Sequence, residues 1–146
     1  MTGVRQVLKA KSADVWTIGP KASVYQALEL MAQRDIGAVP VVDKDKLVGI
    51  FSERDYARKV ALHGRASKST MVGELMSARV YYIQPDQTIE ECMALMTEKH
   101  IRHLPVLDDG KLIGIITIGD VVKAIIADQE ITIESLKSYI TGGYGV

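Results

Sequence analysis

Hydrophobic and polar residues follow the same order twice along this chain of 146 residues. Residues 15–60 align with residues 80–125 at a constant offset of 65 without a gap, and 14 of the 46 aligned positions are identical. A repeat of this length is a whole supersecondary unit, which buries too little apolar surface by itself. The pattern therefore predicts two copies that share one core, packed about a pseudo-twofold axis with paired clefts between them.

The apolar spacing also predicts the elements inside each copy. In the first copy, Val15–Ile18 reads as a short strand, and Ser23 is a suitable N-cap for a helix with apolar residues at i, i+4 and i+7. Residues 38–42 and 47–51 are β-rich runs separated by a polar turn. Each copy thus begins with a strand, a helix and a two-stranded hairpin.

A second helix closes each copy. It starts at Ser52 in the first copy and at Thr117 in the second, because both hydroxyls are fair N-caps, and it runs to about His63 or Asp128. The order β-α-β-β-α, found twice, predicts a mixed α/β (α+β) fold in which the two repeats pack through their sheets.

Shorter segments surround the repeats. Val4–Leu8 resembles Val72–Met76, so a short apolar helix introduces each copy, and a further helix after Asp128 carries Ile133, Leu136 and Ile140 on one stripe before a flexible glycine-rich tail. This last helix caps the core or forms an oligomer contact. The predicted organisation is one module over 1–146, divided into repeat 1 (4–63), linker (64–71), repeat 2 (72–127) and C-terminal helix with tail (128–146).

Composition narrows the class of protein. Lys+Arg and Asp+Glu both number 18, and no stretch carries a dense charge of one sign, which argues against a nucleic-acid or membrane partner. The N-terminus lacks a cleavable apolar segment, and polar residues interrupt the most hydrophobic stretch, 112–127, before it could span a bilayer. We therefore expect a cytoplasmic protein. Cys92 is the only cysteine, so an internal disulfide is impossible, and its place on a buried helix face indicates a small core residue.

Motifs of catalysis and metal binding are missing from the sequence. The three histidines do not have the spacing of a metal site, and the chain contains no GxGxxG, GxxxxGK[ST] or GxSxG motif. The acids that recur are not accompanied by a nucleophile or base. We expect binding without turnover, with no catalytic residue and no metal ligand.

One polar motif recurs in register. The run Gly, apolar, apolar, Ser/Thr, any, any, Asp spans residues 49–55 and again 114–120. A carboxylate one turn into a helix can accept two hydrogen bonds from a vicinal diol, while the hydroxyl and the helix-start N–H groups can hold a phosphate or ribose oxygen. The alternative is that Ser52 and Thr117 are N-caps and that Asp55 and Asp120 are first-turn acids that suit the helix dipole.

These features together resemble a tandem CBS-domain pair, also called a Bateman module, of the small stand-alone prokaryotic kind. The resemblance covers roughly residues 4–127 and rests on the glycines and Ser/Thr-x-x-Asp helix starts above and on four further segments, which are Pro20–Ser23, Pro85–Thr88, Ala38–Asp43 and His103–Asp108. It implies adenosine ligands, namely AMP, ADP, ATP or NAD, with S-adenosylmethionine less favoured. It also implies a homodimer, since similar modules pair through helix faces.

The resemblance assigns residues to two clefts, in which the Asp of one repeat holds the ribose and the first two strands of the other repeat enclose the adenine. Cleft one comprises Ile50, Ser52, Arg54, Asp55, Val80, Tyr81, Ile101, Arg102 and His103. Cleft two comprises Trp16, Ile36, Gly37, Ala38, Ile115, Thr117, Gly119 and Asp120.

The two clefts differ in charge. Arg54, Arg102 and His103 of cleft one replace Gly119, Gly37 and Ala38 of cleft two at the aligned positions. Because a guanidinium binds phosphate in a bidentate manner, the three basic residues are the candidates for phosphate binding, and Arg102 can reach either cleft. The alternative is that the two arginines belong to a solvated ion-pairing face and that His103 is a packed histidine. Trp16 and Tyr81 are candidates for stacking on adenine or are rim and core aromatics.

These observations favour an adenine-nucleotide-binding regulatory module for signal transduction, with two sites of different preference. A ligand-independent interaction or dimerisation module is the main alternative, and a nucleotide-processing enzyme is a third. The physiological nucleotide and the downstream protein partner do not follow from the sequence.

Overall fold

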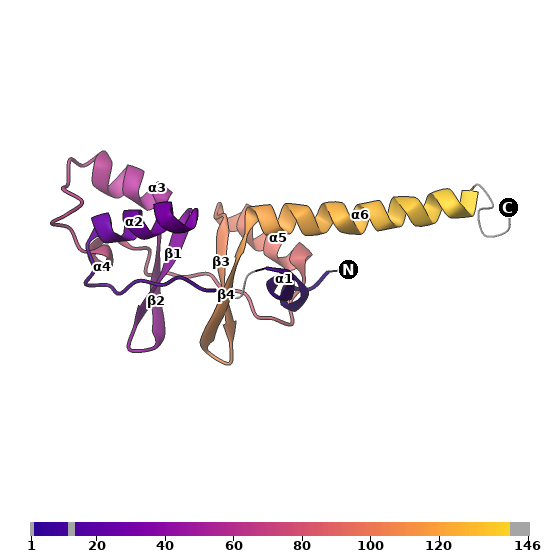
Figure 1. Ribbon diagram of the computed structural model, residues 1–146, viewed down its shortest axis with the longest axis horizontal. Coiled ribbons are helices and arrows are strands. Elements are labelled where there is room, and N and C mark those ends of the chain that lie inside the picture. Colours follow the sequence, from indigo (N-terminus) through magenta and orange to yellow (C-terminus); the bar gives the residue numbers. More distant parts are fainter. Residues whose placement is uncertain (1, 12–13, 141–146) are drawn as a thin grey trace. The chain divides into compact units, whose positions relative to one another are not determined.

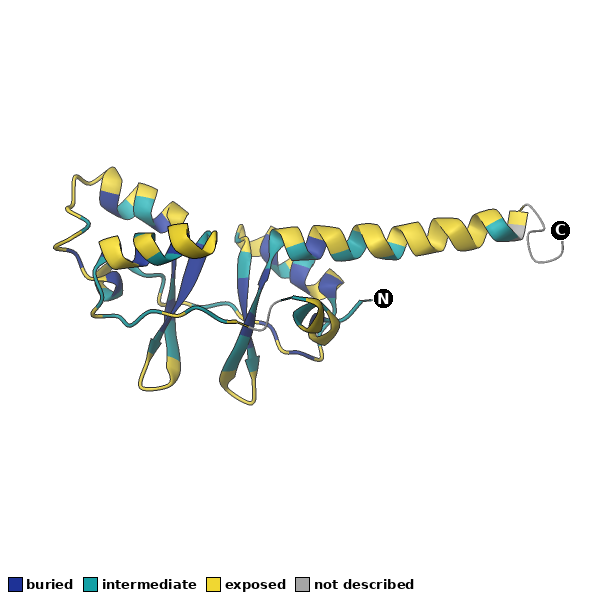
Figure 2. Ribbon diagram, viewed as in Figure 1, coloured by how far each residue is buried: buried dark blue, intermediate teal, exposed yellow. Residues whose placement is uncertain are grey.

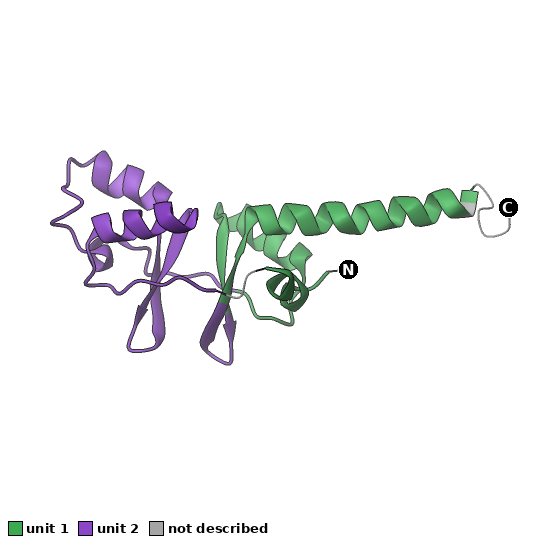
Figure 3. Ribbon diagram, viewed as in Figure 1, with its two compact units in different colours: residues 1–13, 83–106, 114–146 green, residues 14–82, 107–113 purple. Residues whose placement is uncertain are grey.

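The computed structural model describes residues 2–11 and 14–140, and it has the mixed helix and strand architecture that the sequence predicts (Figure 1). The chain forms two compact units, one made of residues 1–13, 83–106 and 114–146 and the other of residues 14–82 and 107–113 (Figure 3). Two small two-stranded sheets, β1-β2 and β3-β4, supply the strands. The predicted α/β class, with one hairpin in each copy, is confirmed.

Helix α2 (Val24–Arg34) shows why the first copy folds as predicted. The Ser23 hydroxyl accepts a hydrogen bond from the backbone N–H of Gln26, and the Gln26 side chain accepts one from the Ser23 N–H, which closes a capping box. Val24, Ala27 and Met31 are buried on one face, at the helical spacing of an amphipathic helix. That face packs in one core with Val39, Val41, Phe51, Val60 and Val72.

Strands β1 (Ala38–Asp43) and β2 (Lys46–Ser52) form an antiparallel hairpin whose bounds agree with the predicted runs to within one residue. Lys44 and Asp45 both have positive φ, at 50° and 64°, as the tight turn between the two strands requires. In the second copy α5 (Ile89–Lys99), β3 (His103–Asp108) and β4 (Lys111–Thr117) have the same order, and Cys92 is fully buried as predicted.

The strand predicted at the start of each copy is reduced to a single bridge. Ile18 bridges Val41 in a parallel sense, and Ile83 bridges Val106 in the same way. The N–H of Ile18 donates to Pro40 at 3.1 Å, but Pro20 follows two residues later and has no N–H to continue a ladder. These segments are extended chain held at one point.

The helices that close the two copies differ in length and kind. In the first copy α3 (Glu53–Asp55) continues into a π-helical segment, η1 (Tyr56–Ala61), whereas the second copy has one continuous helix, α6 (Ile118–Ile140). The prediction of a boundary at Asp128 is therefore wrong. No glycine or proline follows Gly119 within α6, so nothing in this stretch interrupts the helical hydrogen bonding. The predicted glycine-rich tail lies outside the described residues.

The two short introductory helices are exchanged between the copies. Helix α1 (Val4–Ala10) precedes the first copy but pairs with the second, since the N–H groups of Val4 and Arg5 donate to Gln87 and Pro85 at 2.9 and 3.1 Å. Helix α4 (Val72–Leu75) precedes the second copy but pairs with the first, where the Val72 N–H donates to Ala22 at 2.8 Å. A division of the chain at the linker thus separates each copy from the helix that packs on it.

Glycine allows both short helices to approach the hairpins closely. A Cβ built on Gly114 of β4 meets Leu8 Cδ2 at 2.6 Å, and one built on Gly49 of β2 collides with the Met76 side chain and lies 3.1 Å from the Ser77 carbonyl oxygen. The two glycines are equivalent in the repeat, so the same close approach occurs in both copies. Of the helices in the described part of the chain, none is long and apolar enough to cross a membrane.

Candidate functional site

The first recurring motif places Asp55 at the junction of β2 and α3. Its carboxylate oxygen Oδ2 accepts hydrogen bonds from the Ser52 N–H at 2.9 Å and the Ser52 hydroxyl at 3.0 Å, while the Asp55 N–H donates to Ser52 Oγ at 3.1 Å. The residue is 7% exposed, although it is an acid. Reciprocal capping of this kind holds the carboxylate in one orientation.

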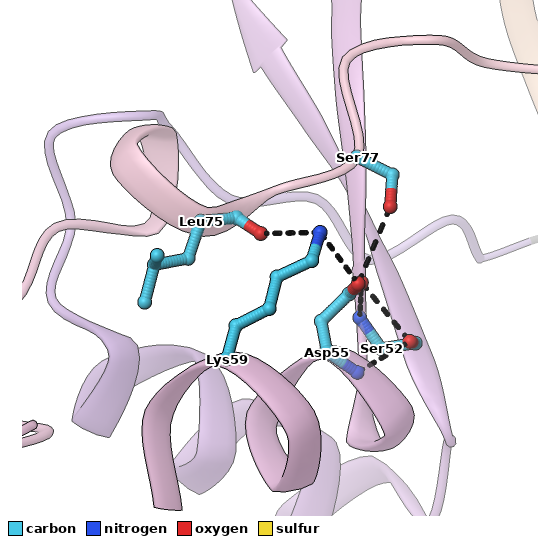
Figure 4. A network of polar contacts seen from close by, with 5 residues as sticks. All are labelled: Ser52, Asp55, Lys59, Leu75 and Ser77. Atoms are coloured by element: carbon cyan, nitrogen blue, oxygen red, sulfur yellow. Dashed lines mark hydrogen bonds and ion pairs between the residues drawn. The ribbon is translucent and has the colours of Figure 1, made fainter. Parts of the chain in front are cut away.

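Two further side chains complete this group, which we call the Asp55 cluster (Ser52, Asp55, Lys59 and Ser77; Figure 4). Lys59 Nζ lies 3.0 Å from Asp55 Oδ1, and the Ser77 hydroxyl donates to the same oxygen at 3.2 Å. Lys59 also donates to the Leu75 carbonyl oxygen at the end of α4, at 3.1 Å. Ser77 is brought here because its backbone pairs with Ile50 of β2.

The second motif builds an equivalent group, the Asp120 cluster (Lys11, Ile115, Thr117 and Asp120). The Thr117 N–H donates to Asp120 Oδ2 at 2.9 Å, and the Asp120 N–H donates to Thr117 Oγ1 at 3.2 Å. Lys11 Nζ donates to the same Oδ2 at 2.7 Å and to the Ile115 carbonyl oxygen at 2.9 Å. The Asp120 side chain is 16% exposed, against 10% for Asp55.

Both motifs therefore act as helix caps, which confirms the prediction that Ser52 and Thr117 are N-caps. The capping uses the Oδ2 oxygen of each carboxylate and fixes the carboxylate at a strand-to-helix junction. Each carboxylate is also neutralised by a lysine, which comes from the following helical turn in the Asp55 cluster and from the N-terminal segment in the Asp120 cluster. A carboxylate has about four acceptor positions, and the four donors to Asp55 take all of them, so a ligand diol would have to displace Lys59 or Ser77 there.

Backbone hydrogen bonds bring other candidate residues to these junctions. The Glu53 N–H donates to the Gly37 carbonyl oxygen at 3.0 Å, and the Ile118 N–H donates to that of Arg102 at 2.9 Å. Gly37 thus adjoins the Asp55 cluster, and Arg102 adjoins the Asp120 cluster, within their own units. The predicted pairing of these residues across the two copies stays a prediction.

The remaining candidates lie in varied surroundings. Exposed residues are Arg54, Arg102 and Gly119, and Ala38 is buried. Half-buried residues are Trp16, Ile36, Gly37, Ile50, Val80, Tyr81, Ile101, His103 and Ile115. The guanidinium carbon of Arg34 lies 3.7 Å from the centroid of the Trp16 ring, so a cation covers one face of this aromatic, which is a candidate either for stacking on adenine or for a rim or core position.

Sequence reasoning missed four polar residues that contact candidate site residues, namely Lys11, Arg34, Lys59 and Ser77. Only Lys59 carried a local signal, since it lies four residues after Asp55 on the same helical face. Lys11 is 109 residues from its partner Asp120. No group of three histidine, cysteine or acidic residues that could hold a metal ion occurs among residues 2–11 and 14–140.

Comparison with known proteins identifies the family. The CBS domain model matches the chain twice, at residues 4–62 and 72–127. The chain therefore belongs to the CBS-domain family and carries two CBS domains.

Particular relatives share most of the chain. The mitochondrial CBS domain-containing protein CBSX3 of Arabidopsis thaliana is 40% identical over 144 residues, which cover 93% of this chain and 69% of the relative. A putative signal-transduction protein with CBS domains from Burkholderia ambifaria MC40-6 has a similar structure, with a TM-score of 0.84 and 56% identity over 88% of this chain and 96% of that one. The CBS domain pair of protein MJ0100, in complex with 5′-methylthioadenosine and S-adenosyl-L-methionine, has a TM-score of 0.77 and 25% identity over 88% and 98%. The predicted cytoplasmic location stays a prediction.

Proposed function

We propose that the chain is a regulatory module that binds an adenosine-containing ligand and does not convert it. The observation that carries this proposal is the pair of carboxylates, Asp55 and Asp120, each fixed by a backbone N–H at a strand-to-helix junction. The complex of the MJ0100 pair with two adenosine compounds supports the same ligand class. AMP, ADP, ATP, NAD and S-adenosylmethionine are the candidate ligands. The MJ0100 complex favours S-adenosylmethionine more than the sequence alone does.

In this proposal each carboxylate accepts hydrogen bonds from the two ribose hydroxyls of one ligand. Ionised carboxylates form stronger hydrogen bonds than neutral acceptors, and the low exposure of Asp55 and Asp120 reduces competition from water. A ligand phosphate would then lie near the helix start, where Arg54 belongs to the helical turn of Asp55 and the backbone of Arg102 adjoins the start of α6. Signalling follows if the ligand binds one arrangement of the protein more tightly than another.

The two lysines make the proposed sites unequal. A diol that takes an oxygen of Asp55 or Asp120 competes with Lys59 or Lys11, and the displaced ammonium becomes available to a ligand phosphate. Lys59 belongs to the helix of its own cluster, but Lys11 follows α1, so binding at Asp120 alters the attachment of the N-terminal segment. We propose that the two sites differ in ligand preference for this reason.

A homodimer is the proposed assembly.

Calorimetry tests the proposal. The full chain is titrated with AMP, ATP, NAD, S-adenosylmethionine and 5′-methylthioadenosine, and the titrations are repeated with Asp55→Asn, Asp120→Asn and the double variant. We expect each single variant to lose one site and the double variant to lose both. Glu53→Gln is the matched control, because this exposed acid lies in the same helical turn as Asp55.

Three results would contradict the proposal. Tight binding that survives the double substitution removes the ribose assignment, and consumption of a nucleotide in the same samples shows an enzyme. If none of the five compounds binds or raises the melting temperature, the result supports the alternative, a ligand-independent interaction module. A ligand at a hundredfold excess over its Kd stabilises the folded state by about 2.7 kcal/mol, which a melting curve detects easily.

A further inference from the structure

The distal half of α6 forms an apolar surface that the proposed function does not use. Helix α6 packs on its own unit through the buried Val121 and is tied down at Asp128, whose carboxylate accepts hydrogen bonds from the Thr2 hydroxyl and N–H at 2.7 and 3.1 Å. From Gln129 to Lys137 every residue is exposed (Figure 2). The helix nevertheless continues in this region to Ile140.

Apart from Ile131, the large apolar residues on this exposed part follow one stripe. Ile133, Leu136 and Ile140 are 50%, 55% and 79% exposed. With Gln129 they are spaced by 4, 3 and 4 residues, which is the alternation of a coiled-coil seam. We call these four residues the C-terminal stripe. A helical end of this length has little stability of its own in water, so a covering partner would stabilise it.

We propose that the C-terminal stripe pairs with the same stripe of a second copy of this chain, with the two helices antiparallel. In that register Ile133 packs against Leu136 of the second copy, and Gln129 lies opposite Ile140. The charges select this direction, because Glu130 of each copy then lies beside Lys137 of the other, which gives two symmetry-related ion pairs along one side of the seam. In a parallel pair Glu130 would face Ile125 and Lys137 would face Thr132, which gives no complementary charges.

The proposed seam is short, so its strength depends on concentration. Stable specific interfaces bury roughly 1,200–2,000 Å² in total, and two stripes of four residues bury less than that. We therefore expect a dimer that dissociates on dilution. The Lys137 ammonium is also 3.8 Å from Glu134, but both side chains are more than half exposed, so this contact does not oppose pairing with Glu130.

Sedimentation of the full chain over a wide range of concentration tests the pairing. Leu136→Glu places a charge in the seam and is expected to abolish the dimer. Glu130→Lys and Lys137→Glu each turn two attractive contacts into repulsive ones and should raise the dimer Kd by about tenfold or more. The variant that carries both reversals should restore the wild-type Kd. Ser135→Lys, on the exposed face beside the stripe, is the matched control and should change nothing.

The outcomes separate this proposal from its competitors. A wild-type chain that stays monomeric at every concentration overturns it, as does a dimer that Leu136→Glu leaves intact. Single reversals without effect, or a double reversal that fails to restore association, exclude the antiparallel register and overturn the proposal as stated. Circular dichroism of each variant confirms that the helices are present. The test uses no nucleotide, so its result is independent of the ligand-binding proposal.

Discussion

Replacement of Asp55 by asparagine should destabilise the protein more than the same replacement at Asp120. Asparagine keeps one acceptor oxygen but replaces the other with an NH₂ donor. The Asp55 carboxylate receives the Ser52 N–H and hydroxyl on one oxygen and the Ser77 hydroxyl and Lys59 ammonium on the other, so an amide leaves at least one donor facing another donor. The Asp120 carboxylate receives the Thr117 N–H and Lys11 on a single oxygen.

The expected loss follows from exposure and from the number of bonds. Hydrogen bonds to charged groups contribute about 1.5–3 kcal/mol each, and the Lys59 pair adds about 1 kcal/mol or less because that side chain is 41% exposed and screened by water. Because asparagine retains part of the capping, we expect a loss of about 2 kcal/mol for Asp55→Asn and about 1 kcal/mol for Asp120→Asn. For a domain of this size these values correspond to about 4–8 °C and 2–4 °C in melting temperature.

Thermal melting followed by circular dichroism measures these differences, with Glu53→Gln as the exposed control, which should melt within about 1 °C of the wild type. Equal melting temperatures for Asp55→Asn and the wild type would refute the reasoning, since they would mean that the four donors to Asp55 contribute nothing net. A larger loss for Asp120→Asn than for Asp55→Asn would reverse the predicted order. The result also shows how far lost ligand binding in either variant reflects lost stability.

Three further predictions concern other parts of the chain. The Thr2 hydrogen bonds hold the pKa of Asp128 below its ordinary value. The stabilisation they give is therefore present above about pH 4 and is lost as the pH falls through the lowered pKa. The melting temperatures of the wild type and Asp128→Asn should converge in acid, and a gap that stays constant with pH would contradict this. Burial, reinforced by nearby acids, raises the pKa of Cys92 to about 11, so iodoacetamide at pH 8 should label the thiol only after denaturation, and rapid labelling of the native protein would show it to be accessible. Gly114→Ala should cost about 1–3 kcal/mol in a denaturant titration because its Cβ meets Leu8, whereas an unchanged midpoint would mean that α1 shifts freely.

Local patterns predicted those elements whose stability is local. The Ser23 cap, the spacing of Val24, Ala27 and Met31, and the polar turn after Asp43 each determine structure through neighbours within a few residues, and the helix and hairpin they predict are present. The repeat then transferred the same elements to the second copy. The predicted boundary at Asp128 aligns with His63 of the first copy, but the helix of the second copy continues past it, because the acids and glutamine that follow are tolerated inside a helix.

Long-range contacts were beyond the reach of such patterns. The sequences of α1 and α4 are so similar that nothing in either indicates which hairpin it packs on. Lys11 meets Asp120 only because α1 pairs with the second copy, so the cation of that cluster could not be found before the exchange was known. Asp55 and Asp120 were found from the register of the repeat, whereas the lysines that neutralise them occupy unrelated positions in it.

The exchange of the introductory helices also determines the order in which the chain can be assembled. Residues 14–82 contain most of one unit and can begin to associate while the remainder is still being synthesised. Thr2, by contrast, bonds to Asp128, which follows it by 126 residues, so the first helix must wait for almost the whole chain. Contacts of such sequence separation slow folding and close the structure late. The N-terminal segment that carries Lys11 is thus the last part to be fastened, and a nascent chain holds the Asp55 cluster before it holds the Asp120 cluster.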